Sequence, residues 1–180
     1  MGCGRAAPQT GHRARLSVSP AERADLKLFV IAVGTRMPAW VEQGYAEYAK
    51  RMPPESRLQL IEIRPEKRDG KSTAQILANE RTRIEAALPA SALPIVLDES
   101  GKSWNTLELS RNLEHWKRDG HDAAFIIGGA DGLDDAIKSR AQTLVSLSAL
   151  TLPHALVRVI LAEQLYRAAS ILQNHPYHRA

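Results

Sequence analysis

Strand-like apolar runs alternate with helix-like segments along the chain from residue 26 to residue 180. The β-rich runs are residues 26–33, 57–63, 95–98, 123–127 and 143–148. Segments with helical periodicity follow them at residues 39–52, 72–88, 105–117, 134–141 and 154–174. Regular alternation of this kind predicts an α/β fold in a single domain, with a mostly parallel sheet of five to six strands and helices on both faces.

Short-range signals support several of these helices. Pro38 opens the first one, because proline is well tolerated at the start of a helix. Asn105, with Glu108 three residues later, resembles a capping box. Glu163 and Arg167 have the spacing of an ion pair between successive turns of the last helix.

Residues 1–25 lack apolar periodicity and are rich in Gly, Ala, Arg, Ser and Pro. They also lack the continuous apolar core of a secretory signal, and Ala6 breaks the myristoylation motif that Met-Gly-Cys begins. An Arg-rich start with few acids also fits a transit peptide. We expect these residues to be a disordered extension without function, or to precede a true translation start at Leu26.

The basic character of the chain is modest outside its amino-terminal part. The net charge is +4 and the pI is 9.4. Residues 1–25 carry four arginines against two acids, so residues 26–180 hold only +2. A net charge of +2 does not predict general binding to polyanions, so any nucleic-acid site must be a local basic patch.

Two further properties restrict the class of protein. The chain has one cysteine, Cys3, which excludes a disulfide framework within the chain and favours a reducing, cytoplasmic setting. No apolar run approaches the roughly 18 residues that a membrane-spanning helix requires, so we expect no membrane partner.

Three loops follow predicted strands, at residues 97–101, 128–132 and 148–153. Ligands of parallel sheets bind beyond the carboxyl ends of the strands, and glycines let a ligand lie against bare backbone. The sequence GGADG is not the dinucleotide fingerprint GxGxxG, so a nicotinamide cofactor is not indicated. We expect a mostly backbone-lined pocket for a ligand such as adenosine. The alternative is that these loops are simple turns.

The last predicted helix runs directly into a polar cluster, HPYHR, at residues 175–179. Histidine, tyrosine and arginine donate protons and contact anions, which favours a functional site over a frayed end. His154 begins the same helix, either as a plain terminus residue or as part of that chemistry. No His/Glu spacing matches a metal site such as HExxH, so we expect no metal.

One face of the last predicted helix is apolar and fits either an internal core or a homodimer seam. Its residues are Leu156, Val157, Ile160, Leu161, Leu165, Ala168, Ala169 and Leu172.

Several motifs together resemble one family. AVGT near the start, IIGG, LSALTLPH, LVRV followed by AEQLYRA, and the terminal NHPYHR are similar to the ribosomal large-subunit pseudouridine N-3 methyltransferases, small enzymes of the SPOUT class. The resemblance spans residues 26–180 and implies a single SPOUT methyltransferase domain there. It also implies a trefoil knot in the carboxyl half, an exception to the rule that chains do not thread loops. GGADG departs from the GGPEG of many relatives but keeps the glycine framework.

The same resemblance implies a cofactor, a partner and a substrate. The cofactor is S-adenosyl-L-methionine, the methyl donor, bound in the knot without a metal. The partner is a second copy, in an obligate homodimer packed through the last helix, where the tail of one subunit completes the site of the other. The substrate is N-3 of a pseudouridine in 23S rRNA, within the assembled 70S ribosome. The cofactor positions carried over by motif are Leu97, Gly128, Leu147, Ser148, Ala149, Leu150, Thr151 and Leu152.

Methylation of a ring nitrogen requires that its proton leave, which predicts the roles of the remaining site residues. His154 and His178 are candidates for handling the proton. Arg167 and Arg179 are candidates for stabilising the resulting anion or binding nearby phosphates, and Tyr177 for stacking on the base. Because the domain carries little charge, we expect low affinity for naked RNA and recognition by ribosome shape. The alternatives are a non-catalytic ribosome-associated factor on the same fold, and a small nucleotide-binding α/β enzyme without the knot.

Overall fold

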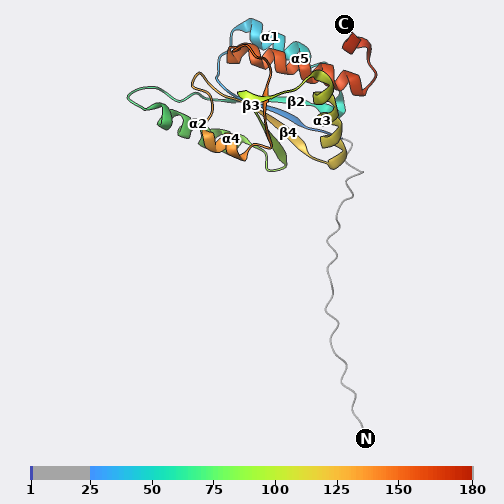
Figure 1. The fold of residues 1–180 in the computed structure, drawn as a ribbon, viewed down its shortest axis with the longest axis horizontal. Helices are drawn as coiled ribbons and strands as arrows, with labels where there is room; N and C mark the ends of the chain where they lie inside the picture. The colour runs from blue at the N-terminus through green and yellow to red at the C-terminus, as the bar shows by residue number, and fades with distance from the viewer. Residues whose placement is uncertain (2–24, 180) are drawn as a thin grey trace.

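The computed structural model describes Met1 and residues 25–179, except for the side chains of residues 178 and 179. The expectations for the amino-terminal extension fall on residues 2–24 and lie outside the described residues. From residue 25 onward, strands and helices alternate as the sequence predicts (Figure 1). The elements are β1 (Leu28–Val33), α1 (Ala39–Ala49), the short 3-10 helix η2 (Pro54–Ser56), β2 (Leu58–Ile63), α2 (Thr73–Ala87), β3 (Ala92–Ser103), α3 (Thr106–Asp119), β4 (Asp122–Ile127), α4 (Asp135–Arg140), β5 (Thr143–Ser146), α5 (His154–Leu172) and the 3-10 helix η3 (Pro176–Arg179).

The strands form one five-stranded parallel sheet in the order β2-β1-β4-β3-β5. Helices α1, α3 and α5 pack on one face, and α2 and α4 pack on the other. Because β1 and β4 lie inside the sheet with both faces covered, every residue of these two strands is buried. The predicted α/β class and parallel sheet are confirmed, and the trefoil knot stays a prediction.

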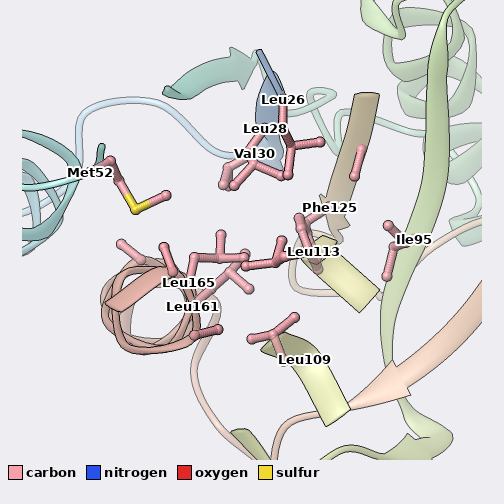
Figure 2. Close-up of a cluster of buried hydrophobic side chains, with 14 of the residues drawn as sticks. Leu26, Leu28, Val30, Met52, Ile95, Leu109, Leu113, Phe125, Leu161 and Leu165 are labelled. Atoms are coloured by element: carbon pink, nitrogen blue, oxygen red, sulfur yellow. The ribbon is translucent and has the colours of Figure 1, made fainter. Parts of the chain in front are cut away.

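The larger of the two cores lies between the sheet and the layer of α1, α3 and α5. Figure 2 shows side chains of the strands, such as Val30 and Phe125, facing Leu161 and Leu165 of α5. All four of these side chains are at most 1% exposed. Burial of a large apolar side chain stabilises a fold by roughly 1.5–3 kcal/mol, so α5 is fixed firmly against the sheet. The buried half of its predicted apolar stripe is therefore internal core.

Two helices begin with a complete capping box. The predicted box of α3 is confirmed, since the Asn105 side chain accepts a hydrogen bond from the Glu108 backbone N–H at 2.8 Å and Glu108 bonds back to Asn105. Ser72 and Gln75 form a second box at the start of α2. These local bonds satisfy backbone donors that a helix leaves free at its start.

Strand β3 differs from the prediction, which ends the strand at residue 98. Leu97 pairs with Val145 of β5, and Lys102 pairs with Val145 again after a register shift. Residues 98–101 therefore form an irregular excursion at the carboxyl edge of the sheet, after which the chain returns to β5. No sequence pattern marks this return, because the segment is polar and lacks strand alternation.

Among the described residues, no helix has both the length and the apolar character needed to cross a membrane.

Candidate active site

A cleft of about 670 Å³ lies at the carboxyl edge of the sheet. Its walls come from five places: the end of β3, the loop after β4, Lys138 of α4, the end of β5 with the loop after it, and the first turn of α5. In Figure 1 this edge is the left side of the molecule, where α5 begins. The three loops predicted from the sequence thus gather at one site, as expected for parallel strands that all end at the same edge.

The loop after β4, GGADG, is a closed turn. Gly132 donates a backbone hydrogen bond to the Gly129 carbonyl at 3.2 Å and has a φ of +82°. A Cβ on Gly128 would lie 2.6 Å from the Gly132 carbonyl oxygen. Only glycine fits such a backbone approach, so the turn presents bare backbone to the cleft.

The excursion of β3 brings a carboxylate into the same cleft. Asp98 lines it and forms an ion pair of 2.7 Å with Lys138 of α4. Burial raises the pKa of Asp98, but hydrogen bonds from Lys138 and from Ser100 outweigh it and lower the pKa to about 2. At neutral pH the cleft therefore holds an ionised carboxylate that is paired with a lysine.

The loop after β5 is ordered by serine hydroxyls. Ser146 Oγ donates to the Ser148 carbonyl at 2.9 Å, and Ser148 Oγ accepts from the Leu150 backbone N–H at 2.9 Å. The loop ends at Pro153, the residue before α5. His154, the first residue of α5, also lines the cleft.

One turn further along α5, the side chain of Arg158 connects this helix to the ends of β1 and β2. Its side chain is 1% exposed and pairs with Glu62 of β2 at 2.7 Å. The guanidinium also donates to the carbonyl of Gly34, just after β1, at 2.8 Å. A buried charge needs such partners, and here they join the ends of β1 and β2 to the first turns of α5.

The carboxyl-terminal tail lies at the opposite end of α5 from the cleft (Figure 1). The Tyr177 ring packs 4.7 Å from the Tyr166 ring and 4.8 Å from the Arg167 guanidinium, measured to ring centroids. Its hydroxyl donates to Glu163 at 3.2 Å. Burial, together with hydrogen bonds to Tyr48 and Glu163, raises the pKa of Tyr177 to about 12.

The predicted ion pair of α5 belongs to the same cluster. Arg167 binds Glu163 at 2.7 Å, and this hydrogen-bonded partner raises the pKa of Arg167. The prediction of a helix ion pair is therefore confirmed. Tyr177 and Arg167 are thus ordered against their own helix, far from the cleft of the same chain.

The structure separates the predicted site residues into two groups. Every predicted cofactor position except Ala149 lines the cleft, together with His154. Arg167, Tyr177, His178 and Arg179 belong to the tail end of α5 or to η3. What any of them binds stays a prediction.

Lys138 at the cleft and Arg158 beside it were not singled out from the sequence. Lys138 lines the cleft because α4 packs beside the strand ends, a placement that no local pattern reveals. Val157, predicted only as part of the apolar face of the last helix, also lines the cleft. Arg158 carries a detectable signal, since it is a lone charge within an apolar helix face.

The fold and the cleft define an α/β protein with a ligand-sized site on the loops at the carboxyl edge of a parallel sheet. The family described as "Predicted SPOUT methyltransferase" matches residues 26–178. The chain therefore belongs to the SPOUT methyltransferase family.

Close relatives agree with this assignment. A protein of Burkholderia thailandensis named "Ribosomal RNA large subunit methyltransferase H" is 59% identical over 156 residues, which cover 86% of this chain and 100% of that protein. A protein of Burkholderia lata with the same name is 58% identical over the same lengths.

Two solved structures share the fold. A probable methyltransferase from Bordetella pertussis Tohama I superposes with a TM-score of 0.53 at 15% identity, covering 83% of this chain and 99% of that chain. A probable methylase family protein from Haemophilus influenzae Rd KW20 superposes with a TM-score of 0.51 at 13% identity, covering 86% of this chain and 70% of that chain.

Proposed function

We propose that this protein transfers the methyl group of S-adenosylmethionine to N-3 of a pseudouridine in 23S rRNA of the assembled 70S ribosome. The observation that carries the proposal is the 59% identity with the whole length of a relative named for methylation of large-subunit ribosomal RNA. The gathering of the predicted cofactor loops around one cleft supports it. A ribosomal substrate implies that the reaction takes place in the cytoplasm.

The cleft fits the proposed cofactor in shape and in chemistry. The GGADG turn presents bare backbone to the cleft, and the position of a Cβ on Gly132 is open space, which suits contact with the flat face of an adenine ring. Leu97 and Leu152 would supply an apolar wall, and backbone groups of Leu147 and Thr151 would supply hydrogen-bonding partners. When bound, S-adenosylmethionine supplies an electrophilic methyl group.

The proposed chemistry on the protein side is to hold the acceptor in line and to remove its proton. His154, which lines the cleft, would accept that proton, or His178 of the partner's tail would do so. Arg167 and Arg179 would stabilise the negative charge that forms on the ring, and Tyr177 would stack on the base. These roles are part of the proposal.

The length of α5 argues that two chains build one site. The helix has 19 residues, so its first and last residues are about 27 Å apart. A tail at one end cannot reach the cleft at the other end of the same rigid helix. A homodimer packed through antiparallel α5 helices would bring each tail to the partner's cleft. The half-buried Leu156 and Ile160, and Leu172 at 39% exposure, offer apolar surface for such a seam.

The direct test of the function is methylation of ribosomes from a strain that lacks this modification. The purified protein and S-adenosylmethionine should add one methyl group to a pseudouridine of 23S rRNA, read by mass spectrometry of the digested rRNA. Ribosomes that gain no methyl group while the protein binds S-adenosylmethionine would contradict the proposed substrate.

Cofactor binding separates an enzyme from a non-catalytic ribosome-associated factor. At a concentration 100-fold above its dissociation constant, S-adenosylmethionine should stabilise the fold by about 2.7 kcal/mol and raise the melting temperature by about 5–10 °C. Adenosine triphosphate at the same concentration is the control. An unchanged melting temperature in a titration to millimolar cofactor would favour the non-catalytic factor.

A further inference from the structure

The positive charge of the domain is concentrated in residues 64–83. This segment, which joins β2 to α2 and includes most of α2, has six basic and three acidic side chains, a net charge of +3. The rest of the chain from residue 26 onward has 14 basic and 15 acidic side chains, a net charge of −1. A domain that is nearly neutral as a whole therefore carries one distinctly basic region.

Two of the three acids of this segment are turned inward. Glu80 is 6% exposed and accepts a hydrogen bond from the Glu66 backbone N–H at 2.9 Å. The Glu66 side chain is 8% exposed and binds both Lys71 and Arg83. Hydrogen bonds from these two cations lower the pKa of Glu66 to about 2. Of the three acids, only Asp69 is exposed, so the outer surface of the segment presents mainly basic side chains.

Five basic residues lie in the β2–α2 loop and the adjoining helix: Arg64, Lys67, Arg68, Lys71 and Arg83. Arg83 donates to the Arg64 carbonyl at 2.8 Å as well as binding Glu66, which also binds Lys71. Arg64 and Lys67 are exposed, and the Arg68 side chain is 63% exposed. We call this set the basic β2–α2 surface. Its buried glutamates hold the loop in place, so binding a partner there costs little ordering entropy.

This surface borders the cleft. Arg68 donates to Asp131 at 2.7 Å, and Asp131 belongs to the GGADG turn that lines the cleft. Glu80 lies just behind the same turn, 3.5 Å from the position of a Cβ on Gly129. In Figure 1 the loop between β2 and α2 projects at the left, from the same edge of the sheet as the start of α5.

We propose that the basic β2–α2 surface binds backbone phosphates of the ribosomal RNA next to the target nucleotide. The inference rests on the proposed function, because that function requires an RNA strand to cross this edge of the sheet. Arginine and lysine side chains bind phosphate oxygens without reading sequence, so the surface positions the RNA while the cleft and the partner's tail select the nucleotide. It is also the local patch that a weakly charged RNA-binding domain requires.

The test compares two double variants with the same loss of charge. Arg64→Gln with Lys67→Gln removes two exposed cations after the carboxyl end of β2. Lys27→Gln with Arg57→Gln removes an exposed lysine and arginine before the amino ends of β1 and β2, at the opposite edge of the sheet. Methylation of unmethylated ribosomes is measured for both and for the unchanged protein, as kcat and KM over a range of salt concentrations.

The proposal predicts that the first variant raises KM for ribosomes roughly tenfold near 0.1 M salt and reduces the slope of log(kcat/KM) against log[salt] by about 1–2. Its kcat at saturating ribosomes, and its dissociation constant for S-adenosylmethionine, should not change. The variant at the opposite edge should match the unchanged protein in all four quantities. Equal KM values and equal slopes for the two variants would overturn the proposal.

Two further arms identify the cause of any effect. Arg64→Lys with Lys67→Arg keeps the charge and should restore KM to within about twofold, since a lysine and an arginine both bind phosphate; failure to restore it would overturn the electrostatic role. The variant with Arg64→Gln and Lys67→Gln should also bind protein-free 23S rRNA at low salt more weakly than the variant at the opposite edge of the sheet. A difference on ribosomes that vanishes on protein-free rRNA would overturn the assignment to phosphates and indicate an acidic ribosomal protein instead.

Failure of this inference is distinct from failure of the proposed function. If the unchanged protein methylates ribosomes and the variants do not differ, only the inference is wrong. If the unchanged protein transfers no methyl group to ribosomes, the proposed function is wrong and the inference falls with it.

Discussion

Close backbone approach at two glycines shapes the cleft. Gly128 lies against the Gly132 carbonyl, and Gly101 lies where β3 returns to β5. A Cβ on Gly101 would be 2.5 Å from the Val145 backbone nitrogen, which no real side chain tolerates. Because the obstacle is backbone, it cannot move aside as a flexible side chain would. The excursion that carries Asp98 into the cleft thus depends on one missing methyl group.

Gly101→Ala should therefore lower both stability and cofactor affinity. We expect a loss of about 1–3 kcal/mol in the free energy of unfolding, because β3 and β5 must separate locally. Urea denaturation and S-adenosylmethionine titration measure the two effects. Gly70→Asn is the control, since Gly70 has a φ of +67°, which asparagine tolerates, and nothing within 4 Å of a Cβ. A Gly101→Ala protein as stable as the control would contradict the close approach.

The Asp98–Lys138 pair predicts how stability depends on pH. The pKa of Asp98 is about 2 in the folded protein and 3.8 as the ordinary value. The pair therefore contributes stability that is fully present above about pH 5 and is lost as pH falls through the folded pKa. The difference in melting temperature between the unchanged protein and Asp98→Asn should be constant from about pH 5 to 7 and shrink toward zero near pH 2. A difference that does not vary with pH would show that the pair is not formed.

At the scale of elements, α5 connects three parts of the molecule. Its first turn borders the cleft, its middle packs against the sheet, and its last turns hold the tail through Glu163, Tyr166 and Arg167. Arg158 fixes the first half of the helix to the ends of β1 and β2. The position of His154 relative to the cleft therefore depends on a buried charge one turn away.

Removing the partner of that buried charge should be costly. Glu62→Gln leaves the Arg158 guanidinium buried with carbonyl acceptors alone, and we expect a loss of about 2–4 kcal/mol in the free energy of unfolding. Adding Arg158→Met should recover part of this loss, since no charge then remains buried. Urea unfolding of both single variants and the double variant measures the coupling. A double variant less stable than Glu62→Gln alone would contradict this account of Arg158.

The positions of the helices and strands could be predicted from the sequence, but contacts between segments far apart in the chain could not. Alternating patterns located all five strands and the helices, and the capping box at Asn105 was correct. These features depend on neighbouring residues, so local patterns record them. The loops of the cleft were also found, because parallel strands must end at one edge.

Contacts between distant segments could not be found in this way. The second pairing of β3 with β5 occurs in a polar segment without strand alternation. The ion pair of Asp98 with Lys138 joins residues far apart in the chain, through the packing of α4. The tail packs on its own helix through Tyr166 and contacts α1 through Tyr48, and the sequence shows both only as unremarkable aromatic residues.

At the scale of the whole molecule, the two ends of α5 carry the two halves of the proposed site. The cleft proposed for the cofactor is at the first end and the tail proposed for the substrate is at the other, about 27 Å away. Under this proposal a single chain holds half of two different sites, and a symmetric pair would hold two complete ones. The basic β2–α2 surface borders the cleft half, so each site would receive its phosphate contacts from the subunit that binds the cofactor.

A mixed dimer tests this composite site most directly. One chain carries Gly128→Val, whose side chain meets the Gly132 carbonyl and distorts the turn that lines its cleft. The other carries Arg179→Ala, which removes a proposed substrate contact of its tail; each homodimer should be inactive in ribosome methylation. Co-expressed with two different affinity tags and purified as the heterodimer, the pair should recover about half of the unchanged dimer's activity, because one of its two composite sites is intact. A heterodimer as inactive as both homodimers, although dimeric and able to bind one S-adenosylmethionine, would contradict a site shared between two chains.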